Sequence, residues 1–433
     1  MTFEAILLIV SVLTVFFAMA RRSIGPELGM PVLALVALLI AGPVGAPHAI
    51  EAAFAEFGRI ALLFTAVAMA AHQLRESEAL KSVGLLAGQW AARAALHYSI
   101  PLRVGVPAIC LVATWALAAV AHNTTSILVM AEVTYIVCVQ FNVRPVPVLC
   151  GTLVASNLGG FSSRFGDTPN LIEARVWDLT HADFFPIMAI NLGCVILLVA
   201  VVALLSAAPK LEPAEISVVE QGFVKARRDL SINKKLAASA IAGLLVIIVP
   251  AIWFPHHEFV FVAAGMLFLC MANLRYAGRG HHPFDVLGFE TLVTLASVFV
   301  LATVLGSAEL GISAFLQGWL QSSGAPVWAI IGISYVGTLF TEAASWANAV
   351  AAMVHGIDPS HRAAWALGSG ICAGSSSLIT AASAGIILLR QTARYPNGQV
   401  TFASYLWFGL GFSLLMVGYY TVVLSMFFPK EAL

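Results

Sequence analysis

The chain has 433 residues, of which 60% are hydrophobic and only 10% are charged. A soluble globular protein carries about 25% charged residues, so this composition excludes a soluble enzyme. The 22 basic and 22 acidic residues balance, so no basic surface exists to bind nucleic acid through its phosphates. The sequence therefore predicts an all-α polytopic membrane protein whose surroundings are a lipid bilayer.

Eight apolar runs are long enough to cross a bilayer, since a crossing takes about 20 helical residues. The first run ends in Arg21-Arg22 and not in a small-residue cleavage site, so we expect a retained helix and no removable signal peptide. The six cysteines lie in apolar stretches without metal-ligand spacing, and we interpret them as core residues. The eight runs are 3–20, 29–46, 58–74, 184–207, 236–254, 258–274, 289–306 and 402–427.

A polar stretch over 209–235 carries six basic residues and divides the chain into halves of similar length. We predict a first transmembrane half over 1–208, a cytosolic loop as linker, and a second transmembrane half over 236–433. The segments 75–98 and 308–322 mix polar and apolar residues at helical spacing, which favours helices lying along the membrane interface.

An internal repeat is indicated by landmarks that recur at nearly constant offsets. We therefore predict a duplication, with repeats over about 50–208 and 280–433 and a deletion in the second; chance alignment of apolar helices is the alternative. The pairs are Phe57 with Phe289 at 232 positions, Gly88 with Gly318 at 230, Asn123 with Glu342 at 219, and Asn157 with Ser375 at 218.

The basic residues predict the orientation in the membrane. With both termini outside, the cytosolic loops and helix ends collect 17 of the 22 Lys and Arg residues, in agreement with the positive-inside rule. This assignment requires each hairpin to return to its starting side, so that the two halves are inverted relative to each other. Inverted repeats place transport sites at the membrane midplane between them.

The first polar cluster is AHNTTS at 121–126, which we predict to be the tip of a re-entrant hairpin. Asn123, Thr124 and Thr125 offer amide, hydroxyl and carbonyl oxygens, which are ligands that suit a hard cation such as Na⁺. A polar loop between two complete crossings is the alternative.

The second cluster, SNLGGFSSRFGDTPN at 156–170, predicts an interrupted helix. Unwound backbone between two half-helices exposes carbonyls to cations and helix N-termini to anions. The residues expected to unwind the helix are Gly159, Gly160, Gly166 and Pro169. Those expected to supply oxygens are Ser156, Asn157, Ser162, Ser163, Asp167, Thr168 and Asn170.

The second half contains a counterpart for each cluster. TEAASWANA at 341–349 corresponds to the hairpin tip, and AGSSSLITAASAG at 373–385 corresponds to the interrupted helix. The second interruption is predicted around Gly374, with Ser375 and Ser376 as oxygen donors. Close helix packing through these small residues is the alternative.

Charged residues in apolar spans are the most informative, because each costs about 2.5–3.5 kcal/mol at a helix centre. Asp167 and Glu342 are the primary candidates for binding a proton or a cation. Arg164 is expected to form an ion pair with one of these acids, with binding of an anionic substrate as the alternative. His122 could protonate near neutral pH or serve only as a hydrogen-bonding residue, and Glu132 could be purely structural. We group these last three as candidates for gating or charge pairing.

The segment SNLGGFSSRFGDTPNLI resembles the Asn-x-Gly-Gly…Gly-Asp-x-Pro-Asn motif of the ion transporter superfamily. That superfamily includes NhaD-type sodium/proton antiporters, arsenite permeases and citrate transporters, and the stretch AAWALGSGICAGSSS is most similar to its magnetosome-associated MamN-like branch. The resemblance implies that residues 123–125 and Glu342 occupy hairpin tips facing the unwound segments, and that the protein forms a homodimer. Two residues depart from the family pattern: His122 stands where antiporter members often have Asp, and Arg164 stands where a neutral residue is usual.

The sequence thus predicts a secondary transporter, a monovalent cation (Na⁺)/proton antiporter, in a bacterial inner membrane or one derived from it. A sodium-coupled or uncoupled anion carrier is the main alternative, and a non-transporting assembly factor of the membrane is a further one. No Gly-x-Ser-x-Gly, His-Glu-x-x-His or P-loop motif is present, so an enzyme is not expected. We expect no cofactor, and no metal other than a transported Na⁺.

Overall fold

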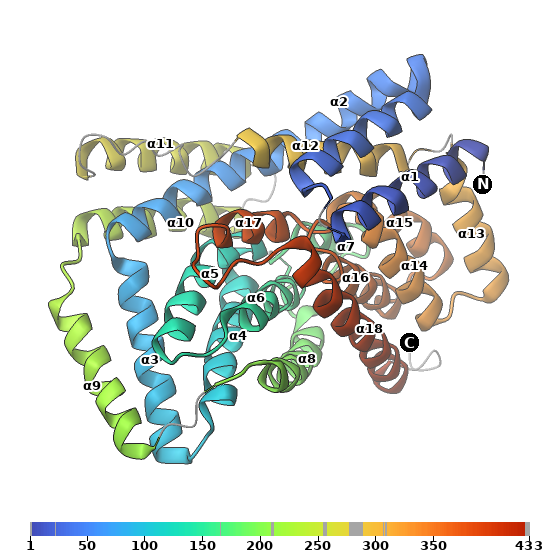
Figure 1. Cartoon of the computed structure of the whole chain (residues 1–433). Helices are drawn as coiled ribbons and strands as arrows, with labels where there is room; N and C mark the ends of the chain where they lie inside the picture. Colours follow the sequence, from blue (N-terminus) through green and yellow to red (C-terminus); the bar gives the residue numbers. More distant parts are fainter. Residues whose placement is uncertain are drawn as a thin grey trace.

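A computed structural model describes residues 2–21, 23–164, 166–208, 212–253, 258–276, 289–305, 307 and 310–428. Over these residues the structure is helical and contains no strand (Figure 1), which confirms the predicted fold class. The helices are α1 Phe3–Ala20, α2 Pro26–Glu76, α3 Ala79–Tyr98, α4 Leu102–Ala121, α5 Asn123–Gln140, α6 Pro145–Gly160, α7 Thr168–Val176, α8 Phe184–Leu205, α9 Pro213–Asp229, α10 Lys234–Trp253, α11 Glu258–Tyr276, α12 Phe289–Leu305, α13 Ile312–Ser323, α14 Val327–Phe340, α15 Ala343–Ile357, α16 His361–Ser375, α17 Ser383–Thr392 and α18 Phe402–Phe427.

Several helices present apolar surface that only lipid can cover favourably. Leu39 on α2, Leu204 on α8 and Trp407 on α18 are each about four-fifths exposed, which is costly in water. The protein is therefore an integral membrane protein. Among the described residues, five segments are long and apolar enough to span a bilayer: Phe3–Ala20, Pro26–Ala55, Leu102–Val120, Phe184–Leu205 and Phe402–Phe427.

The predicted spans 29–46 and 58–74 both fall within α2, and the break in this element lies inside the first predicted span and not between the two spans. Its interruption is a kink at Gly42, whose φ of 70° lies in the left-handed region that favours glycine. Pro43 follows as the first residue of the second part, where a missing N–H costs little, and Pro47 lies about one turn further on. The segment over 48–57 is rich in Ala and Glu, which are strong helix formers, so the helix continues through it.

The central linker is not a loop as predicted, because most of it forms helix α9. This helix packs along α3, where the Phe223 ring lies over Gly88 and a Cβ at Gly88 would come within 2.8 Å of the ring. Arg93 of α3 also donates a 2.7 Å hydrogen bond to Glu220 of α9. The amphipathic helix is thereby attached to the first half of the chain.

The same order of elements occurs in each half: a helix, a helical hairpin, an interrupted helix and a long helix. Helix α4 packs on α6 as α14 packs on α16. Across the halves, α5 packs against α17 and α15 packs against α7, so each hairpin contacts the interrupted helix of the other half. This reciprocal packing agrees with the predicted duplication, while the opposite orientation of the halves in a membrane stays a prediction. The two series are α3, α4–α5, α6–α7, α8 and α13, α14–α15, α16–α17, α18.

Glycines bring the interrupted helices close to the outer arms of the hairpins. A Cβ at Gly159 of α6 would lie 2.2 Å from the Trp115 carbonyl oxygen of α4. A Cβ at Gly370 of α16 would lie 2.4 Å from the Ile331 carbonyl oxygen of α14. Both contacts are too short for any other residue, so these glycines hold the interruptions in the interior, near the centre of Figure 1.

Candidate ion-binding site

Both predicted helix interruptions are present. Helix α6 ends at Gly160 and α7 begins at Thr168, while α16 ends at Ser375 and α17 begins at Ser383. The first connection folds back sharply, since a Cβ at Gly166 would lie 2.3 Å from the Gly160 carbonyl oxygen. The prediction of two interrupted helices is confirmed.

The first hairpin tip closes onto the first interruption. The Asn123 side-chain amide donates a 2.8 Å hydrogen bond to the Asp167 carboxylate, and the Asn123 backbone N–H donates to the Gly166 carbonyl at 3.0 Å. The other Asp167 oxygen accepts the Thr168 N–H at 2.9 Å and so caps α7. Asn123 is only 2% exposed. The tip is therefore buried against the interrupted helix and is not an exposed loop.

Serine hydroxyl groups hold the first hairpin tip in place through its backbone. Ser126 and Ser156 each donate a 2.8 Å hydrogen bond to the Asn123 carbonyl, and their own oxygens are 2.7 Å apart. His122 lies beside Thr124, with its Nδ1 atom 3.0 Å from the Thr124 hydroxyl. Thr124 and Thr125 are both buried. Polar residues of the first two clusters are thus joined by hydrogen bonds through Asn123, Ser126 and Ser156.

The two interruptions also contact each other. Asn157 of the first donates a 3.1 Å hydrogen bond from its side-chain amide to the Ser376 hydroxyl of the second. The long helices satisfy carbonyls freed at each interruption: Tyr405 of α18 donates to the Ser376 carbonyl at 2.7 Å, and Asn191 of α8 donates to the Leu158 carbonyl at 3.2 Å. The backbone can therefore remain unwound without contact with water.

Three of the four glycines predicted to unwind the helices have another role. Gly159 and Gly160 lie in the last turn of α6 and Gly374 lies in that of α16, so only Gly166 is within an interruption. Gly374 allows close packing, since a Cβ there would lie 2.8 Å from the Tyr335 carbonyl oxygen. The serines behind it, Ser375 and Ser376, donate to the Cys372 carbonyl at 3.0 and 2.8 Å.

Glu342 caps the second hairpin arm. Its carboxylate accepts the backbone N–H groups of Ala344 at 2.8 Å and Ser345 at 3.1 Å, and it is 5% exposed. The helix N-terminus there stabilises a negative charge. The structural counterpart of Glu342 is His122, which occupies the same cap position on α5, and not Asn123 as the sequence offsets predicted.

The predicted ion pair of Arg164 is wrong. Within the described chain Arg164 pairs with neither Asp167 nor Glu342, and its Nε atom is buried without a hydrogen-bond partner. Its guanidinium instead faces the loop after α7, where burial and this positive charge lower the pKa of His181. The Arg164 Nε–H is therefore a donor without an acceptor among the described residues.

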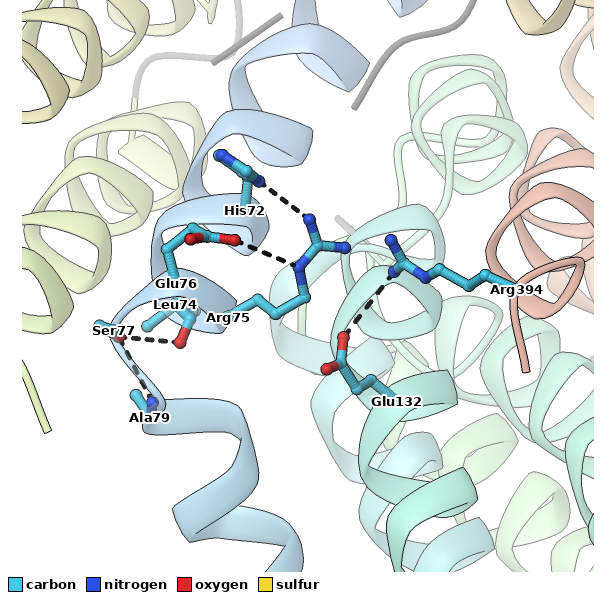
Figure 2. Close-up of polar contacts among 8 residues, drawn as sticks. All are labelled: His72, Leu74, Arg75, Glu76, Ser77, Ala79, Glu132 and Arg394. Carbon is cyan, nitrogen blue, oxygen red and sulfur yellow. Dashed lines mark hydrogen bonds and ion pairs between the residues drawn. The ribbon is translucent and has the colours of Figure 1, made fainter. Parts of the chain in front are cut away.

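Glu132, in the middle of α5, belongs to a charged cluster that is shown in Figure 2. Its carboxylate lies 3.8 Å from the Arg394 guanidinium, and Arg75 approaches the same cluster from the end of α2. Next to it, the rings of Tyr135 and Tyr395 stack at 4.3 Å. These contacts join the first hairpin to the segment after α17 and agree with a charge-pairing role.

Several buried oxygens have no hydrogen-bond partner among the described residues. Leaving such a group unsatisfied costs about 1–3 kcal/mol, which favours binding of a ligand or water. Among the described residues, Arg362 is the one buried Arg or Lys, and it pairs with Asp358 at 3.6 Å, just after the C-terminal end of α15. No group of three His, Cys, Asp or Glu residues in the described chain could hold a structural metal. The unsatisfied oxygens include Asn123 Oδ1, Asn157 Oδ1, Thr338 Oγ1, Ser369 Oγ and Thr380 Oγ1.

One acid was missed by the sequence reasoning. Glu173 in the middle of α7 is completely buried, and neither carboxyl oxygen has a hydrogen-bond partner in the described structure. The sequence contained a signal for it, since Glu173 follows the interrupted segment in the mostly apolar stretch NLIEA. The predicted site ended at residue 170 and therefore did not include Glu173.

Two interrupted helices that meet in the interior, each beside the hairpin of the other half, are typical of membrane transporters. Residues 6–385 match the citrate transporter family. The chain belongs to this family, and the protein is a membrane transporter.

Individual relatives agree with this assignment. An uncharacterized transporter of Mycobacterium tuberculosis is 29% identical over 343 residues, covering 72% of this chain and 74% of the relative. The magnetosome protein MamN of Magnetospirillum gryphiswaldense is 26% identical over 320 residues, covering 69% and 70%. The human P protein is 35% identical over 96 residues, which cover 21% of this chain and 11% of that protein. The predicted resemblance to the ion transporter superfamily and its MamN-like branch is confirmed.

Proposed function

We propose that the protein is a secondary transporter that exchanges a monovalent cation, Na⁺, for protons. The observation that carries this proposal is the closure of the Asn123 tip onto Asp167 at the first interruption. It joins a carboxylate to neutral oxygens at a buried position. A cation in the membrane interior needs both, because oxygens replace its hydration shell and a negative charge offsets its own.

Proton exchange follows from the same carboxylates. When the cation leaves, a buried Asp167 or Glu342 would remain as an uncompensated charge, which favours uptake of a proton. Cation and proton then compete for one group, so each can drive the other. Asn123, Thr124, Asn157, Ser375 and Ser376 are the neutral oxygen donors we propose around the cation.

Alternating access would come from the two halves moving about this site. Reciprocal packing of each hairpin against the interrupted helix of the other half supports inverted repeats. We propose that both termini lie outside and that the protein resides in a bacterial inner membrane or one derived from it. Assembly as a homodimer is part of the same proposal.

The experiment is Na⁺- or Li⁺-driven proton flux in proteoliposomes of known orientation. We expect flux in the wild type and none in the Asp167→Asn, Glu342→Gln double variant, with the folded state checked by gel filtration and thermal unfolding. Equal flux in the two proteins would remove these carboxylates from the mechanism. Absence of flux for every cation and anion in a folded wild type would favour a non-transporting assembly factor.

A second candidate is an anion carrier for citrate, dicarboxylates or oxyanions such as arsenite. It is favoured by the citrate transporter family match and by Arg164, whose guanidinium is not paired within the described chain. A carrier of this kind predicts that citrate raises the unfolding temperature of the wild type and not that of Arg164→Met. The antiporter predicts that Na⁺ stabilises both proteins equally.

A further inference from the structure

Glu173 belongs neither to the proposed cation site nor to any ion pair among the described residues. It lies in the middle of α7, and its side chain faces α16, where a Cβ at Gly368 would lie 2.7 Å from Glu173 Oε2. The Phe161 ring closes the same space, at 2.3 Å from that Cβ position. Glycine at 368 therefore leaves room for the carboxyl group between two helices.

No described residue stabilises a negative charge on the Glu173 carboxyl group by a hydrogen bond or an opposite charge. Glu173 is 0% exposed, and both of its oxygens lack a hydrogen bond. The titratable groups near it are Asp167 on its own helix and Cys372 on α16, which both interact with it electrostatically and neither of which is basic. On α15, His355 contacts the Trp177 ring at 5.3 Å and not the carboxyl group itself. Arg175, the nearest basic residue in sequence, is exposed.

An ionised carboxylate in this setting is strongly unfavourable. Transfer of an unpaired charge into a low-dielectric interior costs so much that the group binds a proton instead. A neutral carboxylic acid can remain there at a cost of a few kcal/mol for its missing hydrogen bonds. Glu173 therefore holds a proton in this conformation.

One unused hydrogen-bond donor lies on the same helix as Glu173. The Trp177 indole N–H is one helical turn further along, at the end of α7, and is buried without an acceptor among the described residues. Residues four apart lie on the same helix face. A shift of α7 along α16 that brings this donor to the carboxyl oxygens would stabilise the ionised form.

We propose that Glu173 is a second proton-binding site, which binds a proton in this conformation and releases it to water when α7 moves against α16. On release, the carboxyl O–H bond breaks, the proton passes to a water molecule and the carboxylate remains. In the reverse step, the carboxylate takes up one proton before α7 and α16 pack together again. Coupling of this step to transport rests on the proposed cation/proton exchange, whereas the protonation itself does not.

Infrared spectroscopy tests the protonation directly. At neutral pH we expect a C=O stretching band of a protonated, buried carboxylic acid that is lost in Glu173→Gln, a variant with the same side-chain volume. Glu78→Gln is the matched control, because the Glu78 side chain is 44% exposed and pairs with Lys81 at 3.4 Å; this variant should lose a carboxylate band instead. Loss of a carboxylate band in Glu173→Gln overturns the proposal.

Flux measurements test the coupling. In proteoliposomes, Glu173→Gln should retain Na⁺-induced thermal stabilisation but lose at least ten-fold in Na⁺-driven proton flux, and Glu173→Asp should regain part of it with a shifted pH profile. Wild-type flux in Glu173→Gln overturns the role in transport. If the wild type shows no Na⁺-driven proton flux, the proposed function fails, and the infrared result still decides whether Glu173 binds a proton.

Discussion

The Asn157 side-chain amide donates a 3.1 Å hydrogen bond to the Ser376 hydroxyl, although 219 positions separate the two residues. Asn157 belongs to the interrupted helix of the first half and Ser376 to that of the second. Both are buried, at 1% and 0% exposure. This single contact joins the two interruptions into one polar centre, and it is the first feature to test by mutation.

Removal of either partner of this bond should destabilise the protein by about 1 kcal/mol, the usual net value of a hydrogen bond. Because the residues are in contact, the double variant Asn157→Ala, Ser376→Ala should cost less than both single variants combined. Denaturant unfolding in detergent micelles measures this. Ser11→Ala, at a hydroxyl bonded only to its own helix, is the control, and strictly additive effects would contradict the contact.

The packing glycines should be intolerant of a methyl group. In Gly159→Ala and Gly370→Ala the new Cβ would lie 2.2 and 2.4 Å from backbone oxygens. Relief of these contacts requires a shift of the helix backbone, which costs free energy, so we expect the free energy of unfolding to fall by about 1–3 kcal/mol or more. The control is Gly418→Ala on α18, where nothing lies within 4 Å. Its unfolding temperature should stay equal or rise, since alanine favours the helix.

Two substitutions at Glu342 separate its structural role from its proposed role in transport. Glu342→Gln keeps an oxygen that can accept the N–H groups of Ala344 and Ser345, so its stability should be nearly unchanged while cation-driven proton flux is lost. Glu342→Ala removes the cap as well and should cost a further ~1 kcal/mol.

The control for that pair is Thr401→Ala, which removes the cap of α18. It should lower the unfolding temperature and leave flux per folded molecule unchanged. If Glu342→Gln transports as well as the wild type, Glu342 serves only as a helix cap.

The Glu132–Arg394 pair in Figure 2 should contribute little to stability. The side chains are 19% and 47% exposed, and pairs of this kind contribute about 0–1 kcal/mol. A double-mutant cycle with Glu132→Gln and Arg394→Gln should give a coupling energy in that range that falls as salt is added. A coupling of several kcal/mol, independent of salt, would show instead that the pair is desolvated and holds the first hairpin in place.

Much of the architecture followed from local sequence. Apolar runs determine where helices form in a membrane, because lipid leaves no other way to satisfy the backbone. The Gly- and Ser-rich clusters at 156–170 and 373–385 predicted both interruptions. Local rules failed where a helix former overrode an expected break, as in α2, and where a polar linker had an apolar face to bury, as in α9.

The sequence by itself thus determined the class of protein, its helices and the position of its interruptions, since these depend on hydrophobicity and on residues that end helices. Only the tertiary structure decided which polar residues meet: it joined Asn123 to Asp167, left Arg164 without an ion pair to either predicted acid among the described residues, and buried Glu173 beside Gly368. The physical reason is that partners lie dozens to hundreds of positions apart, on helices whose relative rotation depends on close packing at a few glycines. Burial of a charge, and with it the capacity to bind a proton or a cation, is a property of that packing and not of any local segment.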